Sequence, residues 1–114
     1  MNTDLDLPTG LSAKGRAAAR IIRALLRERQ TTYTGGCRAF YSPAEWQARG
    51  EQYGTDALLI LCHDGGDLAA YCNPAYEDRD AMRALREALS HIGLFAEQQT
   101  GWYTAIYPRP TSPA

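Results

Sequence analysis

The sequence has few cysteines and no long apolar run. Its 114 residues include only Cys37, Cys62 and Cys72, which cannot all pair within one chain and are too few for a disulfide scaffold. We expect these thiols to be reduced and mostly buried. No apolar run approaches the ~20 residues of a membrane-spanning helix, and the first residues lack the basic start and apolar stretch of a secretory signal. We therefore expect a cytoplasmic protein with no membrane partner.

The chain also lacks a large net charge of either sign, since its formal charge is only −1. The charge is nevertheless unevenly distributed. Residues 11–30 carry six basic residues and one acidic residue, whereas residues 31–114 carry six arginines and ten acidic residues. A basic first segment followed by a mildly acidic remainder is therefore expected. The hydrophobic content of 45% and charged content of 22% are typical of a soluble globular domain.

The first half of the chain reads as helix, strand and helix. Ser12 is a good N-cap for a helix that ends near Arg29, with aliphatic residues at helical spacing along one side. Gly35-Gly36 predicts a turn, and residues 37–41 predict a short strand. The segment Ser42-Pro43-Ala44-Glu45 has the N-cap, the N1 proline and the third-position acid of a capping box. A short helix that ends near Gly50 is therefore predicted.

The second half reads as two hairpins around a third helix. The apolar run 57–62 predicts a central strand, and Gly65-Gly66 predicts a turn into a second strand at 68–72. A helix is predicted from Asp78 or Asp80 to the residue before Gly93. Thr100-Gly101 then separates residues 94–99 from residues 102–107, which predicts a second hairpin.

The predicted fold class is α+β, with helices packed on a mainly antiparallel sheet of four to five strands in the order α-β-α-ββ-α-ββ. We expect a single domain over residues 11–107, a flexible tail over 1–10 and a disordered tail over 108–114, which contains three prolines. An unpaired last strand would allow two copies of the chain to form a homodimer.

The segment Cys62-His63-Asp64-Gly65-Gly66-Asp67 concentrates groups that could perform chemistry at one turn. A metal site would need several such ligands on one ion. Adjacent strand residues point to opposite faces, however, so Cys62 and His63 are poorly placed to share a metal. The chain also lacks a C-x-x-C or H-x-x-x-H pairing and a recognisable cysteine nucleophile signature. What remains is His63, Asp64 and Asp67 at an exposed hairpin tip, which suits contact with a partner.

Two other surfaces are candidates for binding. Arg16, Arg20, Arg23 and Arg27 form a stripe along the first helix that could contact phosphates or an acidic protein. Acidic residues gather around the first hairpin turn and the third helix start: Asp64, Asp67, Glu77, Asp78 and Asp80. The aromatic residues are numerous, and one face of the last strand is expected to expose Tyr103 and Tyr107, which are typical interface anchors.

Several segments resemble small uncharacterised proteins encoded by phages and other mobile elements of bacteria. They are Tyr41–Trp46, Tyr53-Gly54, His63–Leu68 and Trp102–Tyr107, and the resemblance covers roughly residues 37–107. It implies a small accessory protein, for example an inhibitor of a host defence system such as an anti-CRISPR protein. Proteins of this kind commonly act by binding without catalysis.

The sequence therefore predicts a non-enzymatic protein that binds a larger host protein or protein complex, with no cofactor and no metal. The expected contact residues are Arg16, Arg20, Arg23, Arg27, His63, Asp64, Asp67, Tyr103 and Tyr107. One alternative is a nucleic-acid-binding accessory protein that uses the four arginines. A second is a small metal-dependent or cysteine/histidine enzyme, in which His63 or His91 activates Cys37 or Cys62.

Overall fold

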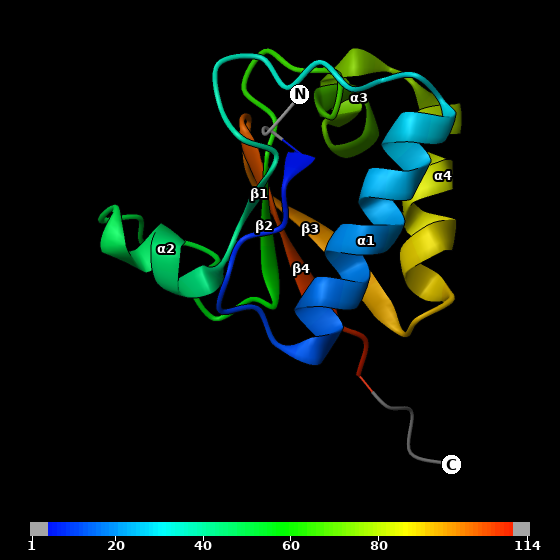
Figure 1. Cartoon of the computed structure of the whole chain (residues 1–114). Coiled ribbons are helices and arrows are strands. Elements are labelled where there is room, and N and C mark those ends of the chain that lie inside the picture. The colour runs from blue at the N-terminus through cyan, green and yellow to red at the C-terminus, as the bar shows by residue number, and fades with distance from the viewer. Residues whose placement is uncertain (1–4, 111–114) are drawn as a thin grey trace.

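The protein consists of a four-stranded antiparallel sheet with helices against both of its faces (Figure 1). The computed structural model describes residues 5–110. In chain order the elements are α1 (Ala13–Glu28), β1 (Phe40–Tyr41), α2 (Pro43–Ala48), β2 (Leu59–Cys62), α3 (Ala69–Cys72), the 3-10 helix η2 (Pro74–Tyr76), α4 (Arg79–Ser90), β3 (Leu94–Thr100) and β4 (Tyr103–Pro108). The predicted α+β class with a mainly antiparallel sheet is confirmed.

One predicted strand is wrong. Residues 68–72 form the short helix α3 instead of the second strand of a hairpin. Both positions beside β2 are already occupied, by β1 on one side and β4 on the other. The turn after β2 therefore cannot return the chain into the sheet next to it. The Ala-Ala pair in this segment also suits a helix better than a strand.

The sheet order is β1-β2-β4-β3, which places the last strand in the interior of the sheet. β4 pairs with β2 and with β3, so the expectation of an unpaired last strand available to a second copy is wrong. Among the described residues, the edge strand next to β4 is β3, which pairs on one side only. The predicted hairpin at Thr100-Gly101 is confirmed, with an irregular register between Gln98 and Thr100.

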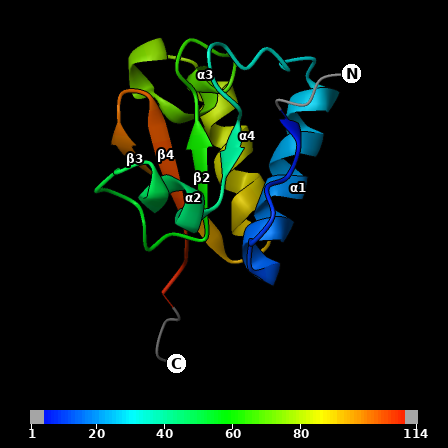
Figure 2. The ribbon, with the colours of Figure 1, turned by 60° about the vertical axis from the view of Figure 1, so that its left-hand side comes forward.

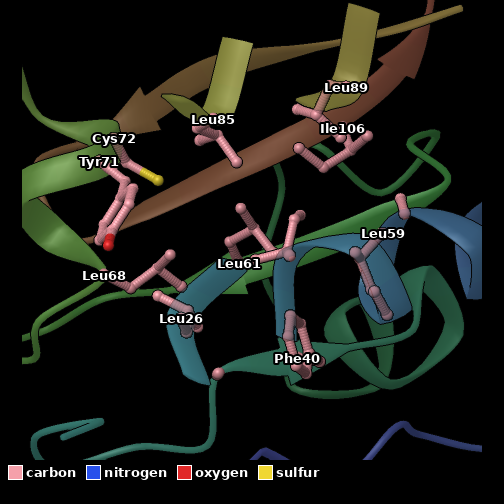
Figure 3. Close-up of a cluster of buried hydrophobic side chains, with 14 of the residues drawn as sticks. Leu26, Phe40, Leu59, Leu61, Leu68, Tyr71, Cys72, Leu85, Leu89 and Ile106 are labelled. Atoms are coloured by element: carbon pink, nitrogen blue, oxygen red, sulfur yellow. The ribbon is translucent and has the colours of Figure 1, made fainter. Parts of the chain in front are cut away.

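The main core lies between the sheet and the helices α1 and α4 (Figure 3). Ser12 caps α1 by accepting a hydrogen bond from the amide of Gly15 at 3.1 Å, as predicted. Asp78 likewise caps α4. The buried side chains of the two helices include Ala18, Ile22, Leu26, Leu85 and Leu89. Their spacing of four residues keeps them on one face of each helix.

A second, smaller core lies on the other face of the sheet, beneath α2. Figure 2 shows α2 on the opposite side of the sheet from α1 and α4. Trp46 of α2 is fully buried against Ile60, Tyr103 and Ala105. Because both faces are covered, β2 is buried at all four of its residues, as its apolar sequence predicted.

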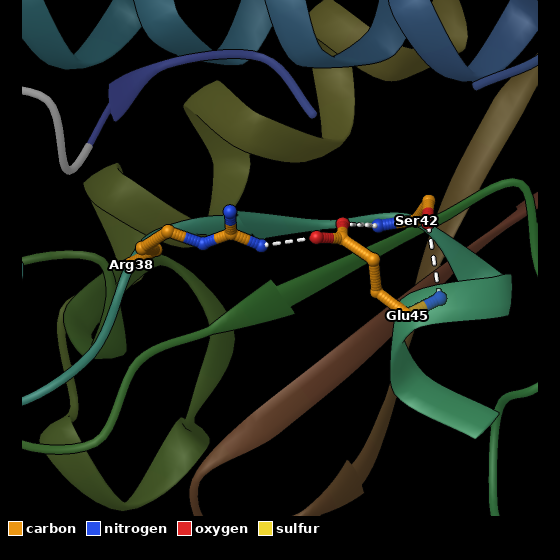
Figure 4. A network of polar contacts seen from close by, with 3 residues as sticks. All are labelled: Arg38, Ser42 and Glu45. Atoms are coloured by element: carbon orange, nitrogen blue, oxygen red, sulfur yellow. Dashed lines mark hydrogen bonds and ion pairs between the residues drawn. The ribbon is translucent and has the colours of Figure 1, made fainter. Parts of the chain in front are cut away.

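The predicted capping box of α2 is confirmed (Figure 4). The Glu45 amide donates to the Ser42 hydroxyl at 3.1 Å, and the Ser42 amide donates to the Glu45 carboxylate at 2.9 Å. Arg38 adds an ion pair to the other carboxylate oxygen of Glu45 at 2.9 Å. These contacts hold the short helix beside the start of β1.

The segment before α1 differs from the expected flexible tail over residues 1–10. Leu5 is 2% exposed and belongs to the main core, and Pro8 is also buried. At the other end, Pro108 still belongs to β4, and the Arg109 amide donates to the carbonyl of Gly93 at 2.8 Å. Residues 1–4 and 111–114, which complete the two expected tails, lie outside the described residues.

Candidate functional site at two interlocked glycine turns

The turn that follows β2 packs directly against the loop between α1 and β1. We call residues 33–37 and 63–67 together the glycine junction. The Asp67 amide donates to the Tyr33 carbonyl at 2.7 Å, and the Asp67 carboxylate accepts from the Tyr33 amide at 3.1 Å. The Gly36 amide donates to the Asp64 carbonyl at 3.4 Å. These backbone contacts join two segments about 30 residues apart in the chain.

Two glycines make this close packing possible. A Cβ atom at Gly66 would lie 2.6 Å from the carbonyl carbon of Thr34, and one at Gly35 would lie 2.7 Å from the carbonyl carbon of Gly65. Gly35 also has a φ angle of +73°, which favours glycine. Both contacts are with backbone atoms, which cannot rotate away as a side chain can. The two glycine pairs in the sequence thus form one interlocked structure rather than two separate turns.

Beside the glycine junction, Cys37 and Cys62 lie close together. Cys62 is buried at the end of β2, and its amide donates to the carbonyl of Ala39. Cys37 precedes Ala39 by two residues and is half-buried. A hydrogen bond from Cys62 lowers the pKa of the Cys37 thiol to about 7, and the positive charge of Arg49 contributes to the lowering. The same hydrogen bond, together with burial, raises the pKa of Cys62.

His63 lies inside the protein, which corrects the prediction of an exposed position at a hairpin tip. It is 1% exposed, and its Nε2 atom forms a 3.0 Å hydrogen bond with the Thr104 hydroxyl. Burial lowers the pKa of His63 to about 4, so the ring is neutral at neutral pH. Its Nδ1 atom has no hydrogen-bond partner among the described residues. His63 contacts Thr104 and Cys62 contacts Cys37, which agrees with the prediction that strand alternation turns the two side chains apart.

The two aspartates of the turn have different roles. Asp67 uses its carboxylate within the junction, where it accepts from the Tyr33 amide. Asp64 is exposed and contributes its carbonyl, which leaves its carboxylate at the surface. Beside them Tyr33 is 66% exposed, the most exposed of the large hydrophobic residues in the described chain. Sequence reasoning missed Tyr33 as a contact residue, although its position two residues before a glycine pair was a usable signal.

The four arginines of the predicted stripe lie together on α1, as expected. Arg20 and Arg27 are exposed, whereas Arg16 and Arg23 are partly covered, so the stripe runs along a flank of the helix. None of the four forms an ion pair with another residue in the range 5–110. The stripe is therefore a basic surface, separate from the glycine junction.

The prediction that the last strand exposes two tyrosines is wrong for Tyr103. This residue is 1% exposed and packs edge-on against Trp46 with ring centroids 4.8 Å apart. Tyr107 is partly buried, and its hydroxyl donates to the Asp56 carboxylate at 2.9 Å. Burial and the nearby Asp56 carboxylate raise the pKa of Tyr107 to about 12. Helix α2 covers the sheet face on which Tyr103 lies, which was expected to be exposed.

The arrangement at the junction provides one accessible thiol with a lowered pKa, but it does not assemble a catalytic set from the predicted partners. His63 contacts Thr104 rather than Cys37, and His91 is exposed at the end of α4. Within residues 5–110, no group of three or more His, Cys, Asp or Glu side chains is placed to hold a metal ion. In the same range, no helix combines the length and apolar character needed to cross a membrane.

Comparison of the chain with protein-family models, with curated proteins and with solved structures gives no match.

Proposed function

We propose that this chain is a non-enzymatic protein-binding protein that docks on a larger protein through its glycine junction. The observation that supports this most directly is Tyr33, a large aromatic side chain that is 66% exposed on a loop held by several backbone contacts. Tyrosine is enriched among the residues that dominate binding energy at interfaces. A loop that is already ordered loses less conformational entropy when it binds.

The charge beside Tyr33 indicates the chemistry of the partner. Asp64 is exposed on the same junction, Glu77 and Asp78 are exposed between η2 and α4, and Asp80 is exposed in the first turn of α4. Figures 1 and 2 both show the loop before β1, helix α3 and the start of α4 at one end of the molecule. We infer a partner surface with an apolar pocket for Tyr33 and basic groups around it. The resemblance to mobile-element proteins extends the proposal to a component of a host defence complex.

Capture experiments with matched variants test this proposal. Immobilised protein is incubated with bacterial lysate, the retained protein is identified by mass spectrometry, and its affinity is then measured with purified components. Tyr33→Ser should weaken binding by about tenfold or more, as expected for an aromatic anchor. Tyr53→Ser is the control, because Tyr53 is 61% exposed but lies in the loop before β2, outside the junction. Equal binding by wild type and Tyr33→Ser would refute the proposal.

A second candidate function is nucleic-acid binding through Arg16, Arg20, Arg23 and Arg27. The supporting observation is that these side chains form no ion pair within residues 5–110. Binding of this kind weakens steeply with salt, because phosphate contacts release counterions. Retained nucleic acid that is lost in Arg20→Glu/Arg27→Glu but kept in Tyr33→Ser would favour this function over the first.

A further inference from the structure

A groove of about 520 Å³ lies between the helices α3 and α4 and the strands β3 and β4. On the helix side it is lined by Cys72, Met82 and Leu85, and on the sheet side by Ala96. Figure 3 shows Cys72 and Leu85 close together above β4. Because Cys72 and Ala96 are small, they leave space beside Leu85 that a larger residue would fill. The volume lies within the range of ligand pockets, which is about 300–1,000 Å³.

The polar groups of the groove are strongly biased in charge. Its lining includes two basic residues, Arg86 and Arg109, and no acidic residue. Arg109 donates through Nε to the Leu94 carbonyl at 3.3 Å, which leaves its terminal nitrogens for another acceptor. Arg86 is exposed and forms no ion pair with any residue in the range 5–110. The two cations therefore have no protein anion in the groove to neutralise them.

The floor of the groove includes a buried hydroxyl that is already satisfied. Thr104 is 1% exposed and shares a 3.0 Å hydrogen bond with His63. A ligand in the groove would therefore meet mainly apolar atoms at its inner end and positive charge from the arginines. Burying a dianion such as a phosphate monoester would carry a larger desolvation cost than burying a monoanion. A planar carboxylate also matches the fork of an arginine side chain.

We propose that this groove binds a small monocarboxylic acid with an aliphatic or aromatic body. The body lies against Leu85, Met82 and Ala96, and Arg86 and Arg109 hold the carboxylate. The groove shares no residue with the glycine junction, so the site is independent of the proposed protein partner.

Octanoate and octanamide provide a matched pair of probes, because they share the same alkyl chain and differ only in the head group, which is an anionic carboxylate in one and a neutral amide in the other. Binding is measured by calorimetry and by NMR chemical-shift changes of the backbone amides. Octanoate should bind saturably and shift the amides of α4 and β3, and octanamide should bind about tenfold more weakly, the factor expected for losing a charged hydrogen bond. Comparable affinities for the two probes, or shifts confined to other parts of the chain, would overturn the proposal.

Variants of the protein test the position of the site. Arg86→Gln and Arg109→Gln should each weaken octanoate binding by about tenfold. Arg83→Gln is the control, because Arg83 is exposed on the same helix but does not line the groove. Ala96→Phe should abolish binding by filling the groove, while circular dichroism and thermal unfolding report whether the fold is kept. If Arg83→Gln weakens binding as much as Arg86→Gln, or if octanoate fails to saturate wild-type protein, the assignment is wrong.

Discussion

Acidification should destabilise this protein through the buried ring of His63. The pKa of this residue falls from 6.5 to about 4 in the native protein, because burial disfavours the charged ring. Between these two values the unfolded chain binds a proton that the native protein does not. The free energy of unfolding therefore decreases as the pH falls from about 6.5 to about 4. Above about pH 6.5 the ring is neutral in both states, and this loss of stability is absent. The pKa difference corresponds to about 3 kcal/mol.

Urea unfolding followed by tryptophan fluorescence measures this contribution, since Trp46 is fully buried in the native state. We expect the free energy of unfolding of wild-type protein to fall between pH 7.5 and pH 4. His63→Gln removes the titrating group and should lose about 3 kcal/mol less over that range. His91→Gln is the matched control, because His91 is exposed at the end of α4. It should keep the pH dependence of the wild type.

A direct titration of His63 in wild-type protein gives a result even if His63→Gln does not fold. The ring proton signals of His63 can be followed by NMR in wild-type protein as the pH is lowered. A pKa close to 6.5 for His63 would refute the reasoning, and so would an identical pH dependence of unfolding in His63→Gln and wild type. In either case the ring would be less well shielded from water than its 1% exposure indicates.

Two further predictions concern the glycine junction. Gly66→Ala should lower the free energy of unfolding by about 1–3 kcal/mol, because its new Cβ would lie 2.6 Å from the backbone of Thr34. Gly36→Ala should be neutral or stabilising in the same urea assay, since nothing lies within 4 Å of a Cβ there; equal losses in the two variants would contradict the interlocked packing. Iodoacetamide should modify Cys37 with a rate that rises through a midpoint near pH 7, because only the thiolate reacts. Cys72, whose pKa burial raises to about 12, should remain unmodified in native protein at pH 7.5, and peptide mass spectrometry showing equal labelling of both would contradict this.

Local sequence signals predicted most of the secondary structure. Ser12, the Ser42 capping box and Asp78 start helices where the sequence placed them, because a cap acts on amides only two or three residues away. The apolar run of β2 and the hairpin at Gly101 are also local patterns, and they formed as expected. The fold class followed from the number and order of these elements.

The errors arose where distant segments compete for the same position. Residues 68–72 are apolar enough for a strand, but β1 and β4 already occupy both sides of β2. Tyr103 alternates away from the main core and would be exposed on an uncovered sheet, but α2 covers that face. No pattern within a single strand reports which other segments will pack on its two faces.

The sequence by itself determined that Cys62 and His63 point in opposite directions and that Gly35-Gly36 and Gly65-Gly66 are turns, since strand alternation and glycine's backbone freedom are local properties. Only the tertiary structure decided that the two turns interlock. In the folded chain His63 is buried, Cys37 lies beside Cys62 and Tyr33 is exposed. The interlocked turns depend on backbone atoms about 30 residues apart in the chain coming within contact distance.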